Sequence, residues 1–142
     1  MESRQIFLLV AAISGFFCIA FGAFGAHALK AALSDDAMIT WQTAVQYHMF
    51  QTLALLVVAL LPMTKPPGSG SRLDLRKQNF RYMAAYLFIL GLILFCGSLY
   101  LLALTELRWL GAITPLGGVS FLAGWVLLFF YAWPIKHEGK RE

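Results

Sequence analysis

Charged residues are scarce in this sequence, and four long stretches contain none. Charged residues make up 13% of the 142 residues, against about 25% in soluble globular proteins, whereas hydrophobic residues make up 60%. The eleven Lys and Arg and the seven Asp and Glu all lie outside residues 5–29, 37–64, 82–105 and 109–135. Because each helix of a soluble bundle needs a charged or polar outer face, this distribution excludes a soluble four-helix bundle.

Cysteines and ligand-binding motifs are also scarce. The two cysteines, Cys18 and Cys96, lie in apolar stretches and do not form a disulfide framework. The glycine-rich segment GAFGAHAL, residues 22–29, lies at the end of an uncharged apolar stretch near a predicted membrane face, and not between a strand and a soluble helix, which argues against a dinucleotide-binding turn. No His-x3-His or Cys-x2-Cys spacing is present, so the sequence predicts neither a metal site nor a cofactor. The distribution of lysine and arginine does not indicate a nucleic-acid-binding surface.

The four uncharged stretches are long enough to cross a membrane. They contain 25, 28, 24 and 27 residues, and a helix needs about 20 residues to span the hydrocarbon core. We therefore predict an all-α, integral membrane four-helix bundle that forms a single domain over residues 1–142, with spans at about 6–26, 41–61, 82–104 and 115–133. The first apolar run is longer than that of a signal peptide and is predicted to be retained.

Lysine and arginine set the predicted orientation. Nine of the eleven lie in the N-terminal tail, the basic loop at residues 64–81 and the C-terminal tail, and only Lys30 and Arg108 lie in the other connections. Since short positive segments stay on the cytoplasmic side, both termini are predicted to be cytoplasmic. Ser34, followed by Asp35 and Asp36, predicts the capped start of the second helix.

Small residues recur at helical spacing on three of the predicted spans. Such faces allow membrane helices to approach closely, so we interpret them as packing surfaces. The predicted helix-packing residues are Ser14, Cys18, Gly22 and Ala26 on the first span, Gly91 and Ser98 on the third, and Gly117, Ser120 and Gly124 on the fourth.

A second group of residues is polar and is predicted to lie near the outer membrane boundary. This predicted outer cluster consists of His27, Trp41, His48, Gln51 and Glu106. Histidines and a carboxylate can form a proton relay, whereas the simpler interpretation is a set of hydrogen-bonded side chains that fasten the outer end of the bundle. Both interpretations remain open from the sequence.

Six stretches combine small and aromatic residues in a distinctive way: AAISG (11–15), GAFGAHAL (22–29), WQTAVQYH (41–48), GSLYLLALT (97–105), ITPLGG (113–118) and FLAGW (121–125). Together they resemble the domain-of-unknown-function 423 family. The resemblance implies a four-helix protein of the bacterial inner (plasma) membrane with no established activity, and it supplies no catalytic residues. Gln51 stands where family members often have a histidine, and Cys96 where a serine is usual, which weakens a catalytic role for a histidine.

Two functional hypotheses follow. The first is a compact, non-enzymatic protein of the lipid bilayer that acts through helix packing, with a second copy of itself or a larger membrane protein as its partner. The alternative is a small oligomeric carrier or proton/solute conduit with its mouth around His27, His48, Gln51 and Glu106. A cavity reaching Gln51 and Ser98 would favour transport, whereas a solid helix interface would favour packing.

Overall fold

The computed structural model describes residues 3–62 and 72–133, and this part of the chain is helical without strands. The elements are α1 (Ser3–Phe24), the π-helical turn η1 (Gly25–Leu29), α2 (Asp35–Leu60), α3 (Arg72–Gly91), the π-helical turn η2 (Leu92–Cys96), α4 (Gly97–Thr105), the 3₁₀ turn η3 (Arg108–Ala112) and α5 (Thr114–Ala132). Four helical segments are long and apolar enough to cross a membrane. The prediction of an all-α protein with four spans is confirmed.

The start of α2 follows directly from its sequence. The Ser34 hydroxyl accepts a hydrogen bond from the backbone N–H of Ala37 at 3.3 Å, and Asp35 and Asp36 occupy the first turn. The hydroxyl satisfies one of the free N–H groups of the helix end, and the carboxylates interact favourably with the helix dipole. The helix begins where the capping pattern predicts.

The third span begins earlier than the uncharged stretch does. Residues 72–81, which we predicted as part of the basic loop, form the first turns of α3, and residues 64–71 lie outside the described residues. Arginine, lysine, leucine and glutamine are good helix formers, so the helix continues beyond its apolar part. Loss of hydrophobicity marks the membrane boundary here but not the helix boundary.

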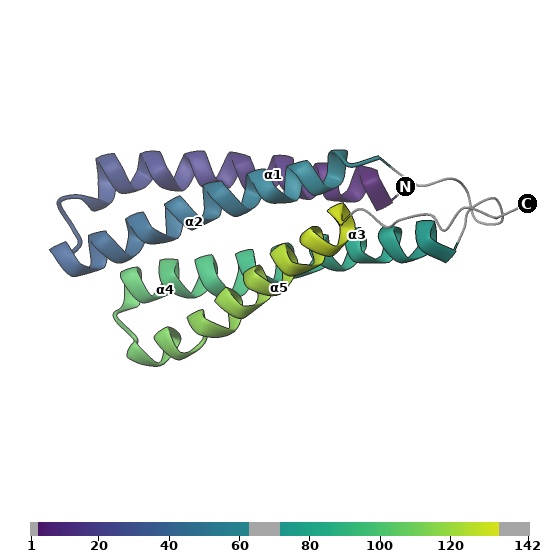
Figure 1. The fold of residues 1–142 in the computed structure, drawn as a ribbon. Coiled ribbons are helices and arrows are strands. Elements are labelled where there is room, and N and C mark those ends of the chain that lie inside the picture. Colours follow the sequence, from purple (N-terminus) through teal and green to yellow (C-terminus); the bar gives the residue numbers. More distant parts are fainter. Residues whose placement is uncertain (1–2, 63–71, 134–142) are drawn as a thin grey trace, which may run out of the picture.

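The helices form two antiparallel pairs that pack against each other (Figure 1). α1 packs on α2, and α5 packs on α3 and η2. The pairs meet where α2 contacts α3, η2 and α4, which places α2 and the α3–η2–α4 helix at the centre of the bundle. The start of α1, the end of α2, the start of α3 and the end of α5 share one end, which we call the terminal end; η1 and η3 lie at the opposite end, the turn end (Figure 1).

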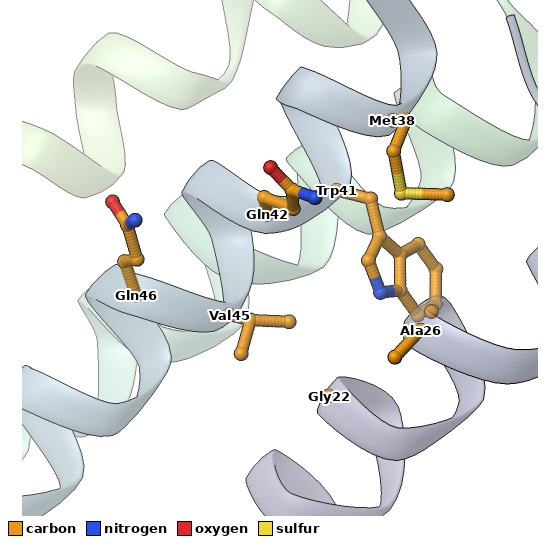
Figure 2. A pocket seen from close by; sticks show the side chains of 8 residues that line it. Gly22, Ala26, Met38, Trp41, Gln42, Val45 and Gln46 are labelled. Carbon is orange, nitrogen blue, oxygen red and sulfur yellow. The ribbon is translucent and has the colours of Figure 1, made fainter. Parts of the chain in front are cut away.

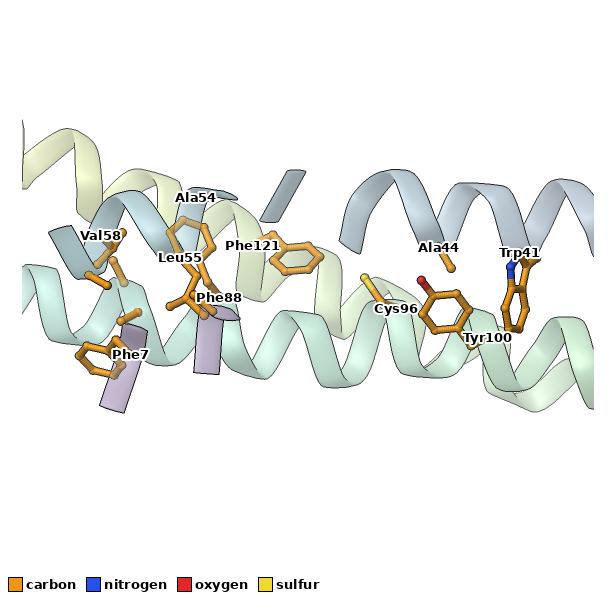
Figure 3. Packing of buried hydrophobic residues seen from close by; sticks show 14 of the residues in the cluster. Phe7, Trp41, Ala44, Ala54, Leu55, Val58, Phe88, Cys96, Tyr100 and Phe121 are labelled. Atoms are coloured by element: carbon orange, nitrogen blue, oxygen red, sulfur yellow. The ribbon is translucent and has the colours of Figure 1, made fainter. Parts of the chain in front are cut away.

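The core lies along this central contact (Figure 3). Towards the terminal end, Phe7, Leu55, Val58 and Phe88 are buried together, and towards the turn end the core contains Trp41, Ala44, Cys96 and Tyr100. Large apolar side chains also cover the outside, and Ile19 on α1 is 76% exposed. An apolar exterior is expected when lipid, rather than water, surrounds the helices.

Candidate functional site

The five residues of the predicted outer cluster do not form one hydrogen-bonded cluster. Trp41, His48 and Gln51 are buried on the inner face of α2, whereas His27 in η1 and Glu106 at the end of α4 are exposed. Spacing along α2 places His48 and Gln51 on one face, as predicted. That face turns into the bundle, however, so His48 lies among other helices and not at an outer mouth.

His48 lies in a chain of buried and partly buried hydrogen bonds that joins three helices. Its Nε2 lies 3.0 Å from the Ser14 hydroxyl of α1, and its Nδ1 lies 3.1 Å from the Tyr100 hydroxyl of α4. The Ser14 hydroxyl also lies 2.6 Å from the hydroxyl of Thr52, one turn beyond His48. We call these four residues, Ser14, His48, Thr52 and Tyr100, the His48 network.

A neutral imidazole satisfies the whole network. If Ser14 donates to Nε2, then Nδ1–H donates to Tyr100 and the Thr52 hydroxyl donates to Ser14; the opposite tautomer reverses these directions. Neither arrangement leaves a ring nitrogen without a partner. Because both nitrogens of His48 are occupied within the bundle, a direct hydrogen bond between His48 and His27 is excluded in this structure.

Aromatic side chains enclose the network at its turn end. The Tyr100 ring lies 4.7 Å from the ring of Trp41 and 4.9 Å from that of Phe21, measured between centroids. The Trp41 Nε1–H donates to the Phe21 carbonyl at 3.0 Å, so the indole also links α2 to α1. The sequence did not single out Tyr100, because an aromatic residue in an apolar helix has no distinguishing signal. Its partners Tyr100 and Ser14 lie 52 and 34 residues from His48 in the sequence, so local spacing does not indicate these contacts.

The small residues of α1 face α2. The Cys18 thiol donates to the Val45 carbonyl at 3.7 Å, and a Cβ added at Gly22 would lie 3.6 Å from the Val45 side chain. Ser14, the first member of this predicted face, belongs to the His48 network, and Ala26 is exposed beside Trp41 (Figure 2). The small-residue face of α1 therefore combines close packing against α2 with the hydrogen bonds of Ser14 to α2.

The small residues of the other spans lie where α5 crosses α3 and η2. A Cβ added at Gly117 would meet the Phe95 backbone, one at Gly124 would meet the Phe88 ring, and one at Gly91 would meet the Phe121 ring. Ser98 and Thr114 share a hydrogen bond of 2.8 Å between α4 and α5. The Ser120 hydroxyl instead donates to the Leu116 carbonyl of its own helix at 3.0 Å.

Two neighbouring hollows lie along the contact between α1 and α2. One, of about 380 Å³, is lined by Gly15, Cys18, Ile19, Gly22, Val45, Met49, Thr52 and Leu53. The other, of about 210 Å³, is lined by Gly22, Gly25, Ala26, Met38, Trp41, Gln42, Val45 and Gln46 (Figure 2). They share Gly22 and Val45, and we call them together the α1–α2 groove. Gln42 and Gln46 lie one turn apart at its edge and are exposed.

Glu106 and its surroundings form a separate hollow at the turn end. Glu106 ends α4 in a left-handed conformation with φ of 57° and lines a space of about 360 Å³ with Asp36, Ser34 and Thr40. In the described residues, no group of three or more His, Cys, Asp or Glu side chains is placed to hold a metal ion.

Comparison with known proteins identifies similar membrane proteins over nearly the whole chain. A family model described as "Protein of unknown function (DUF423)" matches residues 21–118. The inner membrane protein YgdD of Escherichia coli K12, designated UPF0382, is 42% identical over 139 residues, which cover 98% of this chain and 97% of that protein. The UPF0382 membrane protein YwdK of Bacillus subtilis 168 is 41% identical over 124 residues, covering 87% of this chain and 93% of its own. No solved structure matches the chain.

Proposed function

Because the chain belongs to the DUF423 family of membrane proteins of unknown function, we propose that it is a non-enzymatic interaction subunit whose α1–α2 groove packs against a second copy of the same chain. It is a multi-pass membrane protein. By analogy with YgdD, which is called an inner membrane protein, we place it in the inner (plasma) membrane of a bacterium.

The α1–α2 groove is the observation that carries this proposal. It is lined by small residues, Gly15, Cys18 and Gly22. Its other lining residues include Ile19, Met49 and Leu53, which are apolar and exposed, as expected of a surface in contact with lipid. Small residues at a membrane-helix surface allow another backbone to approach closely, so that dispersion contacts replace the missing hydrophobic driving force. A groove of this kind fits a helix from outside the bundle.

The edge of the groove favours a second copy as its occupant. Gln46 is exposed next to Met49 and Phe50, which are also exposed and apolar. Lipid tails cannot hydrogen bond to the amide. An amide has both donors and an acceptor, so Gln46 of one copy can satisfy Gln46 of another across a two-fold axis. Hydrogen bonds between membrane helices contribute about 0.6 kcal/mol on average.

The His48 network supports the non-enzymatic part of the proposal. A catalytic or transport histidine must be reached by its substrate, whereas His48 is only 7% exposed and its ring lies between Ser14 and Tyr100 inside the bundle. The transport alternative also receives less support, since Gln51 and Ser98 are each only 4% exposed. Polar side chains whose hydrogen bonds are made between helices, as in the His48 network, stabilise the contact between those helices.

We further propose that the terminal end faces the cytoplasm. This end carries the starts of α1 and α3 together with the end of α5 (Figure 1). In the sequence, nine of the eleven lysines and arginines lie in the N-terminal tail, in residues 64–81 or in the C-terminal tail, and positive residues of short segments stay on the cytoplasmic side. A phosphatase reporter fused after Glu142 should be inactive and a fluorescent reporter there should be active, because both report the side of the membrane. An active phosphatase fusion would contradict this orientation.

Self-association is tested by disulfide crosslinking in native membranes. In a background of Cys18→Ala and Cys96→Ser, Gln46→Cys should form a disulfide-linked dimer on oxidation, whereas Leu122→Cys, on the exposed face of α5, should not. Gln46→Leu should lower the dimer fraction of the otherwise unchanged protein in mild detergent. Equal crosslinking at both positions, or a product heavier than a dimer that contains another protein, would contradict a second copy as the partner.

A further inference from the structure

Arg81 is a buried charge near the terminal end of the bundle. It lies on α3 directly before the uncharged stretch of the third span, and only 1% of its surface is exposed. One nitrogen, Nη1, donates to the carbonyl of Leu61, the residue that caps α2, at 3.0 Å. The Tyr82 ring lies 4.9 Å from the centre of the guanidinium. The sequence counted Arg81 as a residue of the basic loop, whereas the structure encloses it among the helices.

The remaining edge of the guanidinium has no partner. Nε and Nη2 are buried without a hydrogen bond, and in the described residues no carboxylate forms an ion pair with Arg81. These two nitrogens point the same way from the planar group, and their spacing matches the two oxygens of a carboxylate or phosphate. A buried charge without a counter-charge is strongly unfavourable, so an oxyanion that reached this edge, with the covering side chains moved aside, would be bound strongly.

We propose that the Nε–Nη2 edge of Arg81 binds the phosphate of a phospholipid headgroup. Arg81 is level with the end of α2, where Leu61 and Pro62 terminate an apolar span, and this is the depth at which headgroups meet the hydrocarbon core. Nearby side chains have the amphipathic character of a membrane interface: the Gln78 amide donates to the Tyr82 hydroxyl at 3.0 Å, and Arg76 is exposed over the Phe80 ring.

The burial of Arg81 gives this site a property that surface arginines lack. A phosphate held by the Nε–Nη2 edge lies between the helix ends and not in bulk water, where a charge-assisted hydrogen bond is weaker. Exposed Arg76 has the same charge on the same helix but is screened by solvent and salt. The two arginines therefore form a matched pair for an experiment.

The experiment measures phospholipid that stays bound to the full-length protein. Wild type, Arg81→Gln, Arg81→Lys and Arg76→Gln are purified in mild detergent, washed, and analysed by native mass spectrometry. Unfolding temperatures are then measured with added phosphatidylglycerol, with inorganic phosphate, and with a phosphate-free glycolipid. We expect wild type and Arg76→Gln to retain a phospholipid. Phosphatidylglycerol should raise their unfolding temperatures, whereas inorganic phosphate and the glycolipid should not. Arg81→Gln should lose both properties, and Arg81→Lys should retain less lipid because it keeps the charge but lacks the two-pronged edge.

Several outcomes would overturn the proposal. Equal retention by Arg81→Gln and wild type would show that the edge does not hold the lipid, and an equal loss in Arg76→Gln would show a general charge effect. Stabilisation by inorganic phosphate equal to that by phosphatidylglycerol would identify a free anion as the ligand. If Arg81→Gln fails to fold, the proposal is tested by the lipid retained by Arg81→Lys and by which of the three additives raises the unfolding temperature of the wild type. If the wild type retains no lipid, and Glu138→Gln or Glu142→Gln lowers the unfolding temperature, then a carboxylate of the chain itself is the counter-ion.

Discussion

Replacing Gly117 by alanine should destabilise the bundle, whereas the same replacement at Gly97 should stabilise it. Both glycines lie within helical segments that pack in the same half of the protein. A Cβ added at Gly117 would lie 2.7 Å from the Cα of Phe95, and one added at Gly97 would meet nothing within 4 Å. The two substitutions therefore change helix propensity equally and differ in packing.

The expected magnitudes follow from these two terms. Alanine is favoured over glycine by about 1 kcal/mol inside a helix, so Gly97→Ala should gain about that amount. At Gly117 the obstacle is the backbone of η2, which cannot rotate away as a side chain can. Overpacking costs about 1–3 kcal/mol, and with the upper value and the same propensity gain, Gly117→Ala should lose about 2 kcal/mol.

The assay is reversible unfolding in mixed micelles, with free energies compared at equal denaturing-detergent mole fraction. Gly118→Ala is the matched control, because it neighbours Gly117 on α5 and its Cβ would lie at an ordinary 3.8 Å from the Phe95 ring. If Gly117→Ala proves as stable as Gly118→Ala, then α5 does not approach η2 as closely as described, and the packing interpretation of the small residues of α5 fails.

Three further substitutions test local interactions. Ser34→Ala removes the cap of α2 and should cost about 1 kcal/mol, seen as faster amide exchange confined to the first turn of that helix. Ser14→Ala removes hydrogen bonds to His48 and Thr52 and should lower the free energy of unfolding by about 1–2 kcal/mol; an unchanged value would show that the network contributes nothing. Trp41→Phe retains the ring contacts but loses the bond to α1, so it should cost about 0.6–1.7 kcal/mol in the same unfolding assay, and a larger loss would point to the ring and not the N–H.

The number and type of elements could be predicted because their causes are local. An uncharged stretch long enough to cross a bilayer must satisfy its backbone internally, and a helix is the only open-chain way to do so. The cap at Ser34 likewise depends on residues within one turn. The early start of α3 was missed because charge marks where lipid ends, while helix formation depends on propensity and continues into Arg72–Arg81.

Burial of polar residues could not be predicted, as Arg81 and His48 show. Both were assigned to membrane boundaries because polar side chains usually lie there. Arg81 is instead enclosed where it reaches the carbonyl at the end of α2, and His48 is enclosed by Ser14 and Tyr100. Each depends on a partner at least 20 residues away, whose position follows from how the helices are rotated against one another.

The sequence by itself therefore determined that this is a four-helix membrane protein of the DUF423 family and which side chains share a face within each helix. Helical periodicity places His48 and Thr52 on one side of α2, but it cannot say which helix that side meets. Only the tertiary structure decided that Ser14 and Tyr100 meet His48, that Gly117 meets the backbone of η2, and that Arg81 lies inside the bundle. The physical reason is that rotation and depth of a helix are fixed by its contacts with the others, and those contacts are not encoded in any single segment.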